Sequence, residues 1–177
     1  MDYSKICKIY EALESTSKGL EKTDILARFL GEIRDEPKLI YLLQGRLFPD
    51  YDNSELGISH QLIIKAISRT AGISESEVVD EFKKFGGLGK VAESVLGDKK
   101  KQTALFSKKL SVEKVVDNLK KLATIEGKGT VDKKIGYIVD LLHSATPVEA
   151  KYIVRTVLSD LKIGVGSGIL RDAIVAH

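Results

Sequence analysis

The sequence predicts an all-α fold, a compact array of about ten helices joined by short turns, on three observations. Apolar residues recur at helical spacing in almost every segment, as Ile6, Tyr10 and Leu13 do near the start. The alternation of apolar and polar residues that marks a half-buried strand is nearly absent. Only 3 prolines interrupt the 177 residues, and no convincing repeat divides them. We therefore expect one helical body over residues 1–177.

Boundary residues place individual helices along the chain. A capping-box pattern of Ser74 and Glu77 precedes one helix, and Thr146 with Pro147 and Glu149 combines a cap, a first-position proline and a second box. Residues 48–54 and 98–109 form the longest interruptions. In chain order, helices are expected over residues 3–15, 23–34, 37–44, 59–71, 75–85, 88–96, 112–125, 131–144, 147–160 and 168–176.

Composition and charge bound the class of protein. The single cysteine, Cys7, lies in an apolar stripe, which excludes a disulfide framework within the chain and favours a reducing, cytoplasmic compartment. No apolar run approaches a membrane span, so we expect an intracellular chain with no membrane partner. We also expect a monomer. Residues 97–134 hold 11 lysines against 5 acidic residues, whereas the rest of the chain is net negative. That central segment is where an anionic partner is expected.

A glycine-bearing turn precedes the helix expected over 131–144. Glycine permits positive φ, and a helix start offers unpaired N–H donors and a positive dipole end, so such a turn can bind phosphate. Lysines in the first helical turn oppose the dipole, a local cost that an anionic partner would offset. Thr130 is expected to cap this helix. A solvated loop and helix face is the alternative. The candidate residues are Gly127, Lys128, Gly129, Thr130, Lys133 and Lys134.

A second candidate turn joins the last two expected helices in what resembles a tight hairpin. Its glycines could present amides to a phosphate while nearby cations neutralise charge, as in DNA contact without sequence specificity. An ordinary helix C-cap followed by a turn is the alternative. The candidate residues are Arg155, Lys162, Gly164, Val165 and Gly166.

Two further motifs have competing interpretations. The glycine-rich segment 85–90 lacks the Gly-Lys-Ser/Thr ending of a nucleotide P-loop, and we interpret it mainly as a helix junction. Gln102, Leu105 and Phe106 lie in the lysine-rich stretch. The Leu-Phe pair could anchor a protein partner or could fold onto the core.

Residues for catalysis are poorly represented. His60, His143 and His177 are scattered, and no local cluster suggests a metal site. Cys7 has no neighbouring base that would activate it. We expect no catalytic residue, no metal and no cofactor of its own in this chain.

Several fragments in order along the chain make it resemble the N-terminal DNA-binding domain of ATP-dependent DNA ligases, particularly the archaeal form. The strongest is Leu161-Lys162-Ile163-Gly164-Val165-Gly166. The others are Tyr10-Glu11-Ala12-Leu13-Glu14, Leu20-Glu21-Lys22-Thr23, Tyr41-Leu42-Leu43-Gln44-Gly45-Arg46-Leu47, Leu56-Gly57-Ile58, Gly127-Lys128-Gly129-Thr130 and Ala150-Lys151-Tyr152-Ile153-Val154-Arg155. Their order and spacing together are specific, and they cover nearly the whole chain.

The resemblance implies an all-helical domain that lies over the minor groove on both sides of a nick in duplex DNA. Both glycine turns, with Lys133, Lys134 and Arg155, then contact the phosphate backbone whatever the base sequence. Gln102, Leu105 and Phe106 resemble the motif by which archaeal ligases dock on the sliding clamp (PCNA-type). The implied parent enzyme seals nicks in replication and repair with ATP and Mg²⁺.

The chain also departs from the ligase pattern. Ser159 stands where relatives often have glycine, and Thr130-Val131-Asp132 replaces a more polar and basic continuation. Its nearest match to the catalytic Lys-x-Asp-Gly motif, Lys22-Thr23-Asp24-Ile25, lacks the glycine, and the nucleotidyltransferase and OB-fold domains are missing. We therefore expect a fragment that binds DNA without ligating it. Two alternatives stay open, a helix-hairpin-helix DNA-repair module and a helical adaptor that binds the sliding clamp.

Overall fold

Helices dominate the computed structural model, which describes residues 1–33, 36–47, 56, 58–100 and 109–177, without the side chains of 98–100. No strand occurs within these ranges, so the predicted all-α class is confirmed. The helices are α1 (Tyr3–Glu14), α2 (Gly19–Ile33), α3 (Pro37–Leu43), α4 (His60–Ala71), α5 (Glu75–Phe85), α6 (Leu88–Lys100), α7 (Val112–Thr124), α8 (Val131–Ser144), α9 (Pro147–Val157) and α10 (Ser167–Ala176).

Side-chain caps account for several of the helix starts. The Thr146 hydroxyl accepts the Glu149 N–H at 3.3 Å, and the Glu149 carboxylate accepts the Thr146 N–H at 2.8 Å, which confirms the predicted capping box. The Ser74 hydroxyl accepts the Glu77 N–H at 3.2 Å at the start of α5. Ser59 and Ser111 cap α4 and α7 in the same way. These helices begin within one residue of the sequence prediction.

Three predicted boundaries were wrong. α2 begins at Gly19 rather than at residue 23, because Thr16 organises the entry by accepting the Lys18 N–H and donating to Glu21. α6 continues to Lys100, beyond the expected end at residue 96. α9 stops at Val157 rather than at residue 160, and Ser159 then adopts a φ of 55°, which ends helical geometry.

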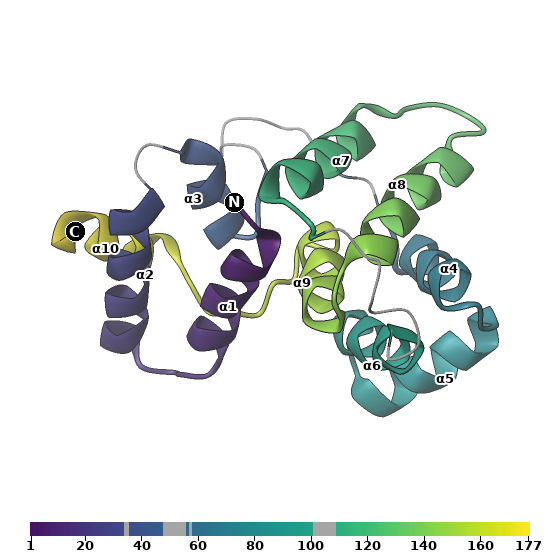
Figure 1. Cartoon of the computed structure of the whole chain (residues 1–177), viewed down its shortest axis with the longest axis horizontal. Coiled ribbons are helices and arrows are strands. Elements are labelled where there is room, and N and C mark those ends of the chain that lie inside the picture. Colours follow the sequence, from purple (N-terminus) through teal and green to yellow (C-terminus); the bar gives the residue numbers. More distant parts are fainter. Residues whose placement is uncertain (34–35, 48–55, 57, 101–108) are drawn as a thin grey trace.

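Helix α9 lies between two groups of helices (Figure 1). On one side, α1 contacts both α2 and α9, and α10 packs on α2; on the other side, α6 packs along α9, and α4 packs against α5, α6 and α8. The two termini lie on the side that holds α1, α2, α3 and α10 (Figure 1). The connection from α9 to α10 therefore runs from the centre of the molecule to the α2 side.

The core explains the central position of α9. Eight of its residues are buried, including Tyr152, Ile153 and Val154, so the helix is covered nearly all round. Tyr152 packs on Tyr10 of α1 with ring centroids 5.0 Å apart, and the Tyr10 hydroxyl donates to the Leu42 carbonyl at 2.7 Å. Cys7 is also buried, as predicted, and burial raises the pKa of its thiol. The C-terminal end of α9, from which the connection to α10 starts, is therefore held firmly by the packing of this buried helix.

Within the described ranges, no helix is long and apolar enough to span a bilayer.

Candidate nucleic-acid interface

The first candidate segment, which we call the 127–130 turn, connects α7 and α8. Gly127 and Gly129 have φ values of 101° and 79°, so both use the left-handed region that favours glycine. A Cβ added at either glycine would meet no heavy atom within 4 Å, so the turn is not crowded by the rest of the molecule. Lys128 and Lys133 are exposed, and Lys134 is half-buried.

The expectation that the Thr130 side chain caps α8 was wrong. Thr130 does stand immediately before the helix, but its φ and ψ of −92° and −5° are not the extended geometry of a cap. Its hydroxyl instead donates to the Gly127 carbonyl at 2.8 Å, within the turn itself. The first-turn N–H groups of α8 consequently lack a side-chain cap and are available to an external acceptor.

The second candidate segment, the 162–166 loop, belongs to the nine-residue connection between α9 and α10. This connection is not the tight hairpin that the sequence suggested, because α9 ends early and α10 packs on α2. Leu161 and Ile163 are buried, whereas Lys162, Gly164 and Gly166 are exposed. Lys162 and Gly164 have φ values of 60° and 65°. None of the described residues accepts the N–H groups of Gly164, Val165 or Gly166.

Other parts of the molecule hold this loop in place. Gly45, with a φ of 70°, lies under Leu161, and a Cβ there would come within 3.2 Å of the leucine Cβ. Lys22 of α2 donates from Nζ to the carbonyl of Ile163 at 2.8 Å and to that of Gly164 at 3.3 Å. This contact was not predicted from the sequence, because it joins residues 141 positions apart.

Arg155, the second cation assigned to this candidate site besides Lys162, lies largely inside the molecule. Its side chain is 7% exposed, and Nη1 lies 3.1 and 3.0 Å from the two carboxylate oxygens of Glu14. The Tyr152 hydroxyl donates to the same carboxylate at 2.7 Å. Partial burial alone would raise the pKa of Glu14, but the hydrogen bonds from Tyr152 and Arg155 outweigh it and lower that pKa. The Arg155 guanidinium therefore interacts mainly with Glu14 of α1, inside the molecule.

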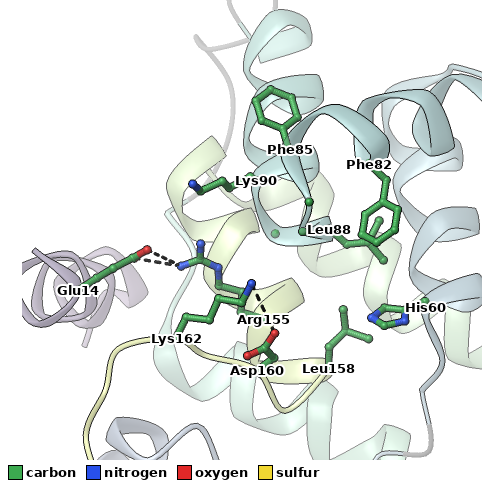
Figure 2. A pocket seen from close by; sticks show the side chains of 13 residues that line it. Glu14, His60, Phe82, Phe85, Leu88, Lys90, Arg155, Leu158, Asp160 and Lys162 are labelled. Atoms are coloured by element: carbon green, nitrogen blue, oxygen red, sulfur yellow. Dashed lines mark hydrogen bonds and ion pairs between the residues drawn. The ribbon is translucent and has the colours of Figure 1, made fainter.

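A pocket of about 330 Å³ lies beside Arg155 and Lys162, and its other wall is the glycine-rich segment 85–90 (Figure 2). The exposed Lys90 and the half-exposed Lys162 come from different elements and border the same hollow. A Cβ on Gly87 would lie 3.6 Å from the Lys162 Nζ. Lys162 is also 3.6 Å from the Asp160 carboxylate, an exposed ion pair that contributes little to stability.

Gly89 has a packing role that the sequence did not reveal. A Cβ at this position would come within 2.8 Å of the Arg155 Cγ and 3.0 Å of the Lys151 carbonyl. Only glycine lets α6 approach α9 this closely. The interpretation of segment 85–90 as a helix junction is therefore confirmed, and the junction also lies against the candidate DNA-binding segment.

The predicted site residues fall into three places. Arg155 and Lys162 line one pocket, whereas the 127–130 turn lies in the connection between α7 and α8, apart from that pocket (Figure 1). Gln102, Leu105 and Phe106 lie outside the described residues. His60 is the first residue of α4, and His143 lies in the last turn of α8. Among the described residues, no group of three or more His, Cys, Asp or Glu side chains could hold a metal ion.

Comparison with known protein families gives a match that covers almost the whole chain. Residues 2–175 match the model of the family described as DNA ligase N terminus. The chain belongs to this family.

Curated relatives extend the same conclusion. The DNA ligase of Methanothermobacter thermautotrophicus is 44% identical over 174 residues, which are 97% of this chain and 31% of the relative. The DNA ligase of Thermococcus fumicolans is 43% identical over 177 residues, covering 98% of this chain and 31% of the relative. That of Nanoarchaeum equitans is 44% identical over 175 residues, with the same coverage. The chain thus spans 31% of the length of these three relatives and is similar to their ligase N terminus.

Membership of this family favours a ligase domain over the helix-hairpin-helix repair module. The match of Lys22-Thr23-Asp24-Ile25 to the catalytic lysine motif also loses support, because Lys22 is buried in α2 and donates to two backbone carbonyls. Lys22 is therefore not placed to attack ATP as the lysine of that motif does.

Proposed function

We propose that this domain binds duplex DNA at nicks, without sequence specificity, through the 127–130 turn and the 162–166 loop. The observation that carries the proposal is the pairing, at both places, of exposed glycine backbone and lysine with an uncapped helix start. N–H groups and lysine ammonium groups at such a site are donors to phosphate oxygens. Phosphates are the same at every base pair, so contacts of this kind accept any sequence.

The two segments would contribute differently to binding. Lys128 and Lys133, and the partly covered Lys134, place positive charge around the 127–130 turn, which favours counterion release from DNA. The 162–166 loop supplies Lys162 together with the outward N–H groups of Gly164 and Val165. Because the segments lie apart in the fold, they would contact different phosphates and so fix the orientation of the duplex.

In the whole protein, we propose that this domain positions the nicked DNA for the regions that carry out ligation. The parent would be an ATP-dependent ligase that seals nicks with Mg²⁺ in regions beyond this chain. Holding both sides of a nick raises the local concentration of the DNA ends for those regions. Ligation by the isolated chain is not expected.

Titration of the purified chain against fluorescent nicked and intact duplexes of unrelated sequence, at several salt concentrations, tests the proposal. We expect similar affinity for all sequences and a steep fall with salt, since about 0.9 counterions are released per neutralised phosphate. Tighter binding to the nicked duplexes would support nick recognition. Absence of binding even at low salt would contradict the proposal and favour the helical adaptor.

Sliding-clamp binding through Gln102, Leu105 and Phe106 stays a prediction from the sequence. Leu105→Ala with Phe106→Ala should abolish binding to a purified sliding clamp while duplex binding is retained. Clamp affinity that is unaffected by both substitutions would reject these residues as the docking motif.

A further inference from the structure

Lys22 is a buried lysine whose ammonium group reaches the 162–166 loop. Its residue exposure is 8%, and its two acceptors are the carbonyls of Ile163 and Gly164, at 2.8 and 3.3 Å. Within the described residues, no carboxylate forms an ion pair with it. Burying a charge is costly unless its donors are satisfied, so the contact with the two carbonyls is what makes this position tolerable.

The two hydrogen bonds also fix the direction of the neighbouring N–H groups. In a trans peptide the carbonyl and the following N–H point in opposite directions, and the described residues contain no cis peptide bond. Lys22 draws the carbonyls of Ile163 and Gly164 toward α2. The N–H groups of Gly164 and Val165 therefore point away from α2, and neither has an acceptor among the described residues.

Gly164 and Lys22 fit each other closely. A Cβ built on Gly164 would lie 2.3 Å from the Lys22 Nζ, so any other residue would displace the ammonium group. The φ of 65° at Gly164 separately favours glycine. The outward donors of the loop thus depend on a contact between α2 and the connection that leads to α10.

We propose that Lys22 is a positioning residue, which holds the 162–166 loop so that the Gly164 and Val165 N–H groups face a DNA phosphate. The inference rests on the proposed function, because the loop must bind DNA for its orientation to matter. Lys22 itself does not touch DNA in this account. Its effect is to remove the cost of ordering the loop when the duplex binds.

The first test measures the loop without DNA. In Lys22→Met the methylene stem is retained and the donors are lost, so we expect the NMR order parameters of the Gly164, Val165 and Gly166 amides to fall from about 0.85 to below about 0.6. Lys22→Arg, which can still donate to carbonyls, should restore most of the order. Lys18→Met removes an exposed lysine near the same helix start and should leave the loop unchanged. A loop that stays rigid in Lys22→Met would overturn the proposal.

The second test asks whether the lysine acts through the loop. Lys22→Met should weaken duplex binding by about tenfold, the scale of one lost charge-assisted hydrogen bond. Combined with Lys162→Met, the losses should be less than additive, because a disordered loop no longer places Lys162. Independent, additive losses would overturn the positioning role. Were Lys22→Met not to fold, Gly164→Ala would displace the ammonium from the other side and give both readouts.

The failures of the two proposals are distinguishable. If the wild-type chain does not bind duplex DNA at low salt, the proposed function fails, and with it the DNA-positioning role. The order parameters would still show whether Lys22 fixes the loop.

Discussion

The 127–130 turn and the 162–166 loop share glycine, lysine and a following helix start, but the rest of the molecule supports them to different extents. The first is closed mainly by its own hydrogen bond from Thr130 to Gly127, and its glycines have open space around them. The second is held by Lys22 and by the buried side chains of Leu161 and Ile163. Similar sequence patterns thus produce an open turn and a preorganised loop, so binding should cost less ordering at the second.

The largest expected difference concerns the ion pairs beside the two segments. Arg155→Met should lower the free energy of unfolding by about 2–3 kcal/mol, because it leaves the Glu14 carboxylate without its buried cationic partner and with only the Tyr152 hydroxyl still donating to it. Arg69→Met, which breaks the exposed contact to Asp132 at the start of α8, should cost less than about 1 kcal/mol. Urea denaturation measures both. If the two variants lost the same free energy of unfolding, the burial of Arg155 would not make its ion pair more stabilising than the exposed pair of Arg69 and Asp132.

A methyl group placed on each segment tests the difference in packing. Gly129→Ala and Gly164→Ala both force alanine into positive φ, at a cost of about 1 kcal/mol each. Gly164→Ala should cost about 1 kcal/mol more, because the Lys22 ammonium must leave the loop carbonyls to make room. Thermal or urea unfolding of the two variants gives the comparison, and similar losses would argue against the Lys22 contact.

Charge reversal should separate the segments in DNA binding. Lys162→Glu is expected to weaken duplex affinity by about tenfold while changing stability by less than about 0.5 kcal/mol, since the side chain is half-exposed. It should also reduce the slope of log affinity against log salt by about 1. Lys8→Glu on the exposed face of α1 controls for net charge. An unaltered affinity in Lys162→Glu would remove this loop from the interface.

The paired change Lys133→Glu and Lys134→Glu should also weaken binding, but by less per charge than Lys162→Glu. These lysines follow an open turn, so more ordering accompanies each contact. Titrations at matched salt measure the ratio. A larger loss per charge at Lys133 and Lys134 would reverse the ranking of the two segments.

The smallest expected effect is the pH dependence of stability that comes from Glu14, the carboxylate paired with Arg155. The pKa of Glu14 is lowered from the ordinary value of 4.5, so its charged form stabilises the fold. That contribution is complete above the unfolded-state pKa and is lost as the pH falls through the lower, folded-state value. Wild type should therefore exceed Glu14→Gln in stability near neutral pH, and their unfolding free energies should converge in acid. A constant difference at all pH values would contradict this assignment.

The sequence predicted most of the fold because helix boundaries are encoded locally. Ser74 and Thr146 each cap a helix by accepting the N–H group of the residue three positions further along the chain, so both caps are recognisable in the sequence. The prediction for Thr130 was wrong because a threonine hydroxyl can donate to a preceding carbonyl, here that of Gly127, instead of accepting an N–H group of the helix that follows. The early end of α9 was also missed, although Ser159, with its φ of 55°, occupies a position where glycine would be favoured.

The candidate site was predicted only in part, since its support depends on contacts between distant segments. Lys22 and Gly89 show no spacing relation to the residues they contact, so periodicity could not place them. Arg155 was assigned to phosphate on its charge, but the structure buries its side chain and pairs it with the carboxylate of Glu14. The glycines and Lys162 were identifiable because positive φ and exposure follow from short motifs.

The most direct test of the account is an amide chemical-shift titration of the isotopically labelled chain with a nicked duplex. We predict the largest changes at Gly127, Gly129, Gly164, Val165 and Gly166. Binding that leaves these amides unchanged and perturbs other surfaces would contradict the claim that the two segments form the DNA interface.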